Sequence, residues 1–201
     1  MNGIVCAAAA PAINAVLYSG ACKYAAGSSV RRTLCRASAF AVLAAGTALE
    51  CAVLILQRGM PAGMLVALSA AVVCAATDAA TGYVFDVVTL SALSFSFCAS
   101  TFGHALPSSL AGAAACGGLY YVLYIVTGRR GIGLGDVKLA ACIGAGLGVA
   151  RGAEAAGVAF IAGGCWAAVL LMRGARRRSE MRFAPYMAAG ALTCAAWSVL
   201  A

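Results

Sequence analysis

The sequence predicts an all-α polytopic membrane protein, a bundle of about eight transmembrane helices. Hydrophobic residues make up 64% of the 201 residues and charged residues only 10%, and the mean hydropathy is +0.96. This composition excludes an ordinary soluble domain. Long apolar runs without period-two alternation favour helices, because backbone groups inside a bilayer must bond within a helix or a closed barrel.

Apolar runs follow one another along the whole chain and form one predicted transmembrane domain over residues 1–201. The first run, residues 4–21, follows an N-terminus without Lys or Arg, so we interpret it as a retained span. Processing near residues 19–22 is the alternative. The later runs cover residues 37–56, 60–77, a stretch after Asp86 ending near 104, 107–127, a glycine-rich stretch ending at 151, 153–172, and 183 to the end.

The basic residues predict the orientation of the bundle. Of the fourteen Lys and Arg residues, twelve lie in the breaks after the odd-numbered runs and two in the breaks after the even-numbered runs. Cytoplasmic loops carry the excess of Lys and Arg, so both termini are expected on the non-cytoplasmic side. The same count places Asp78, Asp86 and Asp136 at the cytoplasmic face.

Composition also weighs against two kinds of binding partner. The formal net charge is +8, but the basic residues occupy short breaks between apolar runs, so we predict no nucleic-acid binding. The ten cysteines are scattered without a CxxC pair, and His104 is the only histidine. We therefore expect neither a metal site nor another cofactor, and we interpret most cysteines as small apolar packing residues.

Two aspartates are the candidate catalytic residues. The chain has only six acidic residues, and Asp136 lies where the glycine-rich segment GRRGIGLGDVKL, residues 128–139, enters an apolar run. Asp78 ends the third run on the same predicted face, so bundle packing can bring the two together. Neighbouring carboxylates share a proton, and such a pair can activate a water while it polarises a carbonyl. Each aspartate has the alternative role of a helix cap at the membrane interface.

Other residues of these segments receive supporting roles. Gly133 and Gly135 are expected to let the backbone approach closely and leave room for an extended substrate. Lys138 is expected to face away from Asp136, toward lipid head groups. Asp86 precedes an apolar run as an N-cap residue does. Glu50, inside the second run, is assigned no role.

Three stretches resemble motifs of the type IV prepilin peptidase family of GxGD membrane aspartyl proteases. Residues 78–86, DAATGYVFD, look like the D-x-x-T-x-x-I-P-[DN] pattern, in which Asp78 matches a catalytic aspartate, and Thr81 and Asp86 match its other polar positions. GLGDVKL is similar to the GxGDVKL block, and Asp136 there matches the second catalytic aspartate. RFAPYMAAGAL resembles the PFGPYLALGA segment at Phe183, Pro185 and Tyr186, a match that implies structural support or substrate binding.

The chain departs from the family pattern at two places. Phe85 stands where the family usually has proline. Larger members carry a cytoplasmic domain with paired CxxC motifs that accompanies N-methylation, whereas here residues 22–36 form a shortened loop with only Cys22 and Cys35. The resemblance thus implies peptidase activity and gives no support to N-methyltransferase activity. GxGD also occurs in presenilin-like proteases, but their Tyr-Asp and Pro-Ala-Leu partners are not found here.

The resemblance implies a membrane-embedded aspartyl endopeptidase of the bacterial cytoplasmic (inner) membrane. Its substrates would be type IV prepilins or pilin-like secretion proteins, which have a basic leader followed by an apolar helix, and it would cut at the cytoplasmic face. Two alternatives stay open: an ion-coupled transporter that uses membrane carboxylates, and an inactive relative that serves in assembly. Formation of a homo-oligomer also stays open.

Overall fold

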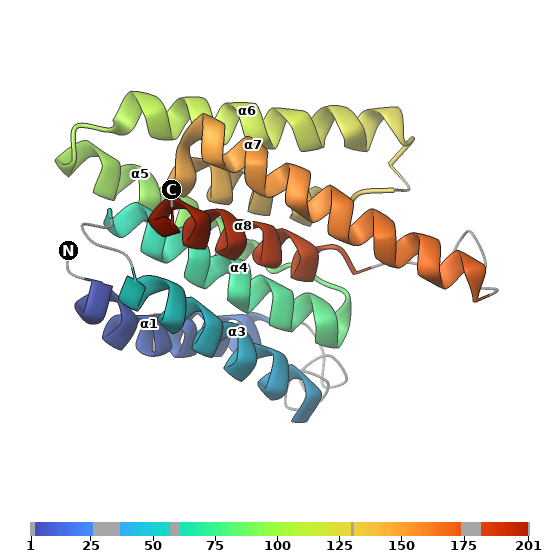
Figure 1. The fold of residues 1–201 in the computed structure, drawn as a ribbon, viewed down its shortest axis with the longest axis horizontal. Helices are drawn as coiled ribbons and strands as arrows, with labels where there is room; N and C mark the ends of the chain where they lie inside the picture. The colour runs from blue at the N-terminus through green and yellow to red at the C-terminus, as the bar shows by residue number, and fades with distance from the viewer. Residues whose placement is uncertain (1–2, 26–36, 57–60, 130, 174–181, 201) are drawn as a thin grey trace.

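The computed structural model describes residues 3–25, 37–56, 61–129, 131–173 and 182–200. All regular secondary structure in these ranges is helical (Figure 1). The elements are α1 (Gly3–Tyr24), α3 (Ala37–Leu56), α4 (Ala62–Thr81), α5 (Asp86–Phe102), α6 (Leu106–Val126), α7 (Leu134–Met172) and α8 (Ala184–Leu200). The predicted helical class is therefore confirmed.

The helices run roughly side by side and alternate in direction, so the bundle has two ends (Figure 1). Both chain termini lie at one end. The end of α4 and the starts of α5, α7 and α8 lie at the other, which we call the junction end. This arrangement agrees with the alternation expected from the sequence, although the membrane side of each end stays a prediction.

Helix α4 occupies the centre of the bundle and packs against α1, α3, α5, α7 and α8 (Figure 1). Its residues from Gly63 to Asp78 are all buried, because it is apolar all round and polar side chains occur only at isolated positions. Packing against five helices thus holds the last turn of α4, which carries Asp78, at the junction end.

Helix α7 contains both the sixth and the seventh predicted runs. Gly148 inside it has φ 80° and ψ 178°, and the chain reverses there, so that the two arms lie side by side (Figure 1). The prediction of eight separate helices is not confirmed, since the described residues form seven. A single glycine with positive φ makes the reversal without a loop, and the break falls before Arg151 rather than at it.

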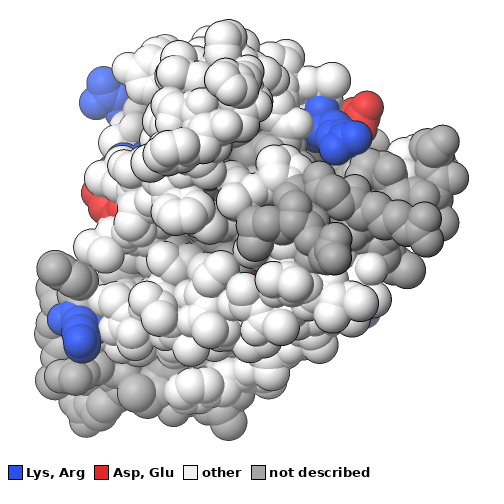
Figure 2. Space-filling view, turned by 90° about the vertical axis from the view of Figure 1, so that its left-hand side faces the viewer, with Lys and Arg blue, Asp and Glu red and all other residues white. Residues whose placement is uncertain are grey.

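Several helices are long and apolar enough to cross a membrane. Within the described ranges these are Ile4–Lys23, Ala62–Thr81, Leu106–Val126 and Leu134–Met172, and α3 and α5 add shorter apolar helices. The end that carries the termini shows a mostly uncharged described surface with only a few charged side chains (Figure 2). These properties are those of a helical membrane protein.

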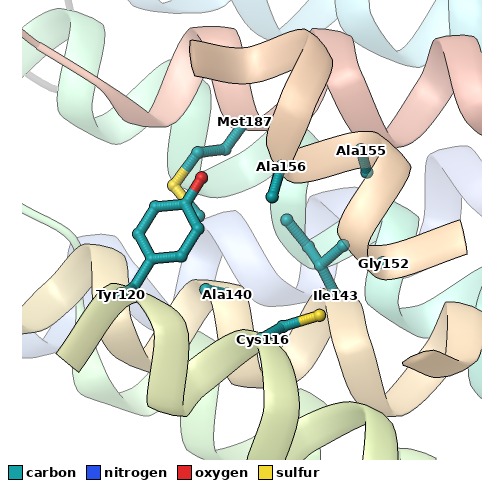
Figure 3. Close-up of a pocket in the computed structure, with 8 residues that line it drawn as sticks. All are labelled: Cys116, Tyr120, Ala140, Ile143, Gly152, Ala155, Ala156 and Met187. Atoms are coloured by element: carbon teal, nitrogen blue, oxygen red, sulfur yellow. The ribbon is translucent and has the colours of Figure 1, made fainter. Parts of the chain in front are cut away.

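Small side chains pack closely where α6, α7 and α8 meet in the core. A cavity of about 10 Å³ lies between α6, both arms of α7 and α8, and Tyr120 and Met187 lie at one side of it (Figure 3). This space is about the smallest that holds one water. Five cysteines are buried among apolar side chains of the core, which confirms their role as packing residues: Cys6, Cys74, Cys116, Cys142 and Cys194.

One carboxyl group is buried in the core away from the junction end. Glu50 of α3 has no exposed surface, and its two oxygens accept hydrogen bonds from Ser69 Oγ of α4 at 2.7 Å and Asn14 Nδ2 of α1 at 2.9 Å. Asn14 Nδ2 also donates to Thr47 Oγ1 at 3.0 Å. This cluster joins three helices through polar side chains, and gives Glu50 a packing role that the sequence did not assign.

Candidate functional site

Asp78 lies in the last turn of α4 and is almost completely buried, with 6% of its surface exposed. The helix continues past it to Thr81 and ends at Gly82, whose φ of 74° is left-handed and whose N–H bonds to the Asp78 carbonyl at 2.8 Å. The side chain of Asp78 accepts a hydrogen bond at Oδ2 from the Ala184 N–H at 3.1 Å. The carboxylate therefore satisfies a free donor in the first turn of α8.

The segment that begins α8 positions this donor. Phe183 precedes the helix and its carbonyl accepts from the N–H groups of Tyr186 and Met187. Pro185, a predicted support residue, is the second residue of α8, where its missing N–H leaves no bond unmade. Arg182 lies just outside the helix, and its guanidinium donates to the Ala79 carbonyl near Asp78.

Asp136 lies in the first turn of α7, at the third helical position. Its Oδ2 accepts a hydrogen bond from the Gly133 N–H at 3.1 Å, which caps the start of the helix. Gly135 lies against Val84 of the loop between α4 and α5, and a Cβ added to it would lie 2.8 Å from Val84 Cβ. The absence of a side chain at Gly135 therefore makes room for Val84, while the expected role toward a substrate stays a prediction.

The two aspartates line the same cavity at the junction end. This cavity has a volume of about 520 Å³ and is open to the surroundings. Asp78 approaches it from the end of α4 and Asp136 from the start of α7. Its wall consists of Asp78, Thr81, Gly82, Tyr83, Val84, Arg129, Gly131, Ile132, Gly133, Gly135, Asp136, Arg182 and Phe183.

Thr81 lies in this wall and ties the turn after α4. Its hydroxyl donates to the Thr77 carbonyl at 2.7 Å and accepts from the Tyr83 N–H at 3.2 Å. These bonds hold the turn that follows Asp78. The predicted residues Thr81, Gly133 and Gly135 therefore all lie with the two aspartates.

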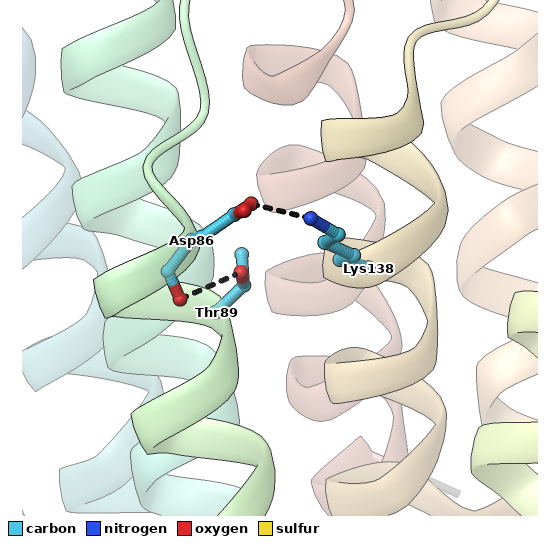
Figure 4. Close-up of polar contacts among 3 residues, drawn as sticks. All are labelled: Asp86, Thr89 and Lys138. Atoms are coloured by element: carbon cyan, nitrogen blue, oxygen red, sulfur yellow. Dashed lines mark hydrogen bonds and ion pairs between the residues drawn. The ribbon is translucent and has the colours of Figure 1, made fainter.

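Two predicted residues, Asp86 and Lys138, lie outside the cavity wall and contact each other. Lys138 Nζ lies 2.7 Å from Asp86 Oδ1, and the two side chains point toward one another across the space between α7 and α5 (Figure 4). The expectation that Lys138 serves lipid head groups is therefore wrong for this structure. Its partner lies 52 positions away in the sequence, a pairing that local spacing does not reveal.

Asp86 also differs from its expected role as an N-cap. The residue in the N-cap position of α5 is Phe85, and Asp86 is the first helical residue. No side-chain capping bond forms there, whereas the Asp86 carbonyl accepts from the Thr89 hydroxyl at 3.3 Å (Figure 4). A carboxylate in the first turn still interacts favourably with the helix dipole.

Two arginines of the cavity wall were not singled out from the sequence. Arg129 has a positive φ of 64°, and its guanidinium carbon lies 5.9 Å from the centre of the Tyr124 ring. Arg182 bonds near Asp78, as described above. Both belong to basic breaks that we interpreted only as topology signals. The adjacency of Arg182 to the FAPY segment was the available clue.

The arrangement offers acid–base chemistry to an extended ligand. Two carboxylates line one open cavity, and backbone N–H groups hold one oxygen of each; among the described residues no hydrogen bond holds the second oxygen of either, which can therefore meet a water or a substrate. Within the described residues, no three His, Cys, Asp or Glu side chains gather in the manner of a metal site.

Comparison with known families shows the family to which the chain belongs. A model of the type IV leader peptidase family matches residues 65–169, a little over half of the chain. The chain belongs to this family. The matched segment contains both Asp78 and Asp136, so the type IV leader peptidase family covers the two helices that carry them. No curated protein and no solved structure matches the chain significantly.

Proposed function

We propose that this protein is a membrane-embedded aspartyl endopeptidase whose catalytic residues are Asp78 and Asp136. The observation that carries the proposal is that both carboxylates line one open cavity at the junction end. Membership of the type IV leader peptidase family supports the same reaction class. Both aspartates lie within a turn or two of a helix terminus, which favours a peptidase over an ion-coupled transporter with carboxylates at the bilayer midplane.

Hydrolysis would proceed through a proton shared by the two carboxylates. The ionised aspartate takes a proton from a water held between them, and the protonated aspartate donates a hydrogen bond to the scissile carbonyl. The oxygen of that water then adds to the carbonyl carbon, and the aspartate that took its proton gives a proton to the leaving amine as the peptide bond breaks. The Ala184 and Gly133 N–H groups keep each carboxylate oriented during these steps.

The proposed substrates are type IV prepilins or pilin-like secretion proteins. Their basic leader would enter the cavity in an extended form, and the apolar helix that follows would stay in the bilayer. The excess of Lys and Arg in the breaks of the junction end supports a cytoplasmic position for this site, in the inner membrane of a bacterium. The shortened loop at residues 22–36 falls largely outside the described residues, and N-methylation is not part of the proposal.

The experiment is cleavage of a co-expressed prepilin by the wild type and by Asp78→Asn and Asp136→Asn. Asparagine keeps an oxygen that accepts from the Ala184 or Gly133 N–H but cannot exchange the proton. We expect leader removal by the wild type and at least about a 100-fold loss in each variant.

Glu154→Gln is the matched control, because Glu154 is an exposed acidic residue on the second arm of α7. It should cleave like the wild type. Persistent cleavage in both aspartate variants would show that the pair is not the catalyst, and absence of cleavage by the wild type would refute the proposed substrate class.

A further inference from the structure

The ion pair between Lys138 and Asp86 connects the two segments that carry the aspartates. Lys138 lies in α7, two residues after Asp136, and residues at this spacing point to different sides of a helix. Asp136 faces the cavity, while Lys138 reaches to the first residue of α5 (Figure 4). The same turn of α7 thus holds a cavity carboxylate on one side and an ionic contact on the other.

The loop between α4 and α5 completes this connection. It begins at Gly82, four residues after Asp78, and ends at Phe85, directly before Asp86 opens α5. The start of α7 contacts this loop through Gly135 against Val84, and it contacts the first residue of α5 through Lys138 against Asp86. Because Asp78 itself is held in α4, these two contacts help to fix the first turn of α7 relative to it, in addition to the packing of α7 against α4, α6 and α8.

The exposure of the pair separates a positioning role from a role in stability. The Lys138 side chain is 37% exposed and the Asp86 side chain 58% exposed. Ion pairs with this exposure contribute little to the free energy of unfolding. The rate of a reaction between positioned groups is far more sensitive, since a displacement of about 1 Å can cost roughly 100-fold.

We propose that Lys138 and Asp86 are a positioning pair that holds Asp136 at its working distance from Asp78. This inference rests on the proposed function of the two aspartates and assigns residues outside the cavity to the same reaction. In this proposal neither Lys138 nor Asp86 contacts the substrate. The pair acts through the placement of the first turn of α7.

The experiment is a charge-exchange cycle in the full-length protein with a purified prepilin as substrate. Lys138→Met and Asp86→Asn should each lower kcat by about 10- to 100-fold and change KM much less, because the cavity wall stays intact. The double neutral variant should be no slower than the slower single variant, since the two losses share one cause. Exchange of the charges in one protein, Asp86→Lys together with Lys138→Asp, should give a kcat at least about tenfold higher than that of Lys138→Met or of Asp86→Asn.

Arg151→Met is the matched control, since Arg151 is an exposed basic residue beside the reversal of α7. Its kcat should equal that of the wild type, and all variants should unfold thermally within a few degrees of it. Additive losses, no recovery on charge exchange, or full activity of Lys138→Met would overturn the positioning pair.

Asp136→Asn, run in the same series, keeps the two proposals apart. If Asp136→Asn is inactive while Lys138→Met cleaves like the wild type, only the positioning pair fails. If Asp136→Asn cleaves like the wild type, the proposed catalytic function fails, and the positioning pair with it.

Discussion

The Ala184 N–H donates a hydrogen bond to Asp78 Oδ2 at 3.1 Å, and so joins the first turn of α8 to the last turn of α4. The Asp78 carboxylate thus connects two helices and also lines the cavity. A substitution at Asp78 therefore affects both chemistry and packing, and the two effects separate according to whether the new side chain accepts a hydrogen bond.

Asp78→Leu should be less stable than Asp78→Asn, although both should be inactive. Leucine removes the acceptor and leaves a buried N–H without a partner, at a cost of about 1–3 kcal/mol, whereas asparagine retains an acceptor oxygen. Thermal unfolding in detergent measures the difference. Equal stability of the two variants would show that the Ala184 bond contributes nothing.

Gly135→Ala should reduce activity much more than Gly133→Ala. The added Cβ at residue 135 would lie 2.8 Å from Val84 Cβ, whereas at residue 133 the nearest contact is 3.5 Å, an ordinary van der Waals distance. The first turn of α7 must therefore shift only in Gly135→Ala, and we expect at least tenfold slower cleavage than in Gly133→Ala. Parallel initial rates on one prepilin measure this ratio, and similar rates would contradict the close approach.

Gly82→Ala should destabilise the protein by about 1 kcal/mol, because an L-residue is strained at a φ of 74°. Within the described ranges no atom lies within 4 Å of the added Cβ, so the expected cost comes from the backbone conformation. Gly82→Asn should cost less, since asparagine tolerates the left-handed region better. Chemical or thermal unfolding of the three proteins checks the order Gly, Asn, Ala.

Phe85→Pro should be at least as stable as Phe85→Ala. Phe85 has φ −83°, close to the range that proline imposes, and among the described residues its N–H donates no hydrogen bond. Both substitutions remove the partly buried ring, but proline restricts the unfolded chain. Comparison of unfolding midpoints tests this, and a lower midpoint for proline would mean that the turn does not accept the residue usual in the family.

Glu50→Leu should destabilise the fold by about 1–3 kcal/mol more than Glu50→Gln. Leucine offers no acceptor to Ser69 and Asn14, while glutamine keeps an amide that bonds to both. Cleavage per folded molecule should stay unchanged in Glu50→Gln, because Glu50 lies outside the cavity wall. A selective loss of activity at full stability would instead assign Glu50 to the reaction.

Much of the fold follows from the sequence because apolar runs in a membrane protein have few alternatives. The run at residues 37–56 coincides with α3. Helix α4 extends past the expected end at residue 77 to Thr81, and Gly82, with its positive φ, caps it there. The union of the sixth and seventh runs was missed because Arg151 suggested a break that Gly148 makes instead.

The site was predictable only in part. The segments around Asp78 and Asp136 stood out, since acidic residues are rare in this chain and their order resembles a known family. The contacts of Lys138 with Asp86 and of Arg182 with the Ala79 carbonyl depend on which helix ends lie next to each other. Neither the spacing of residues nor the distribution of charge in the sequence predicts which ends do so. Membrane topology already explained the basic residues, so nothing in the sequence indicated that some of them contact the site.

The hydrogen bond from Ala184 bears on how much of the chain the proposed active site needs. The segment matched by the family ends at residue 169, before α8 begins, although it contains both aspartates. A chain shortened to that segment would lose the donor to Asp78 and also Arg182 and Phe183 from the cavity wall. The proposed site therefore includes the start of α8, which lies outside the segment that matches the family.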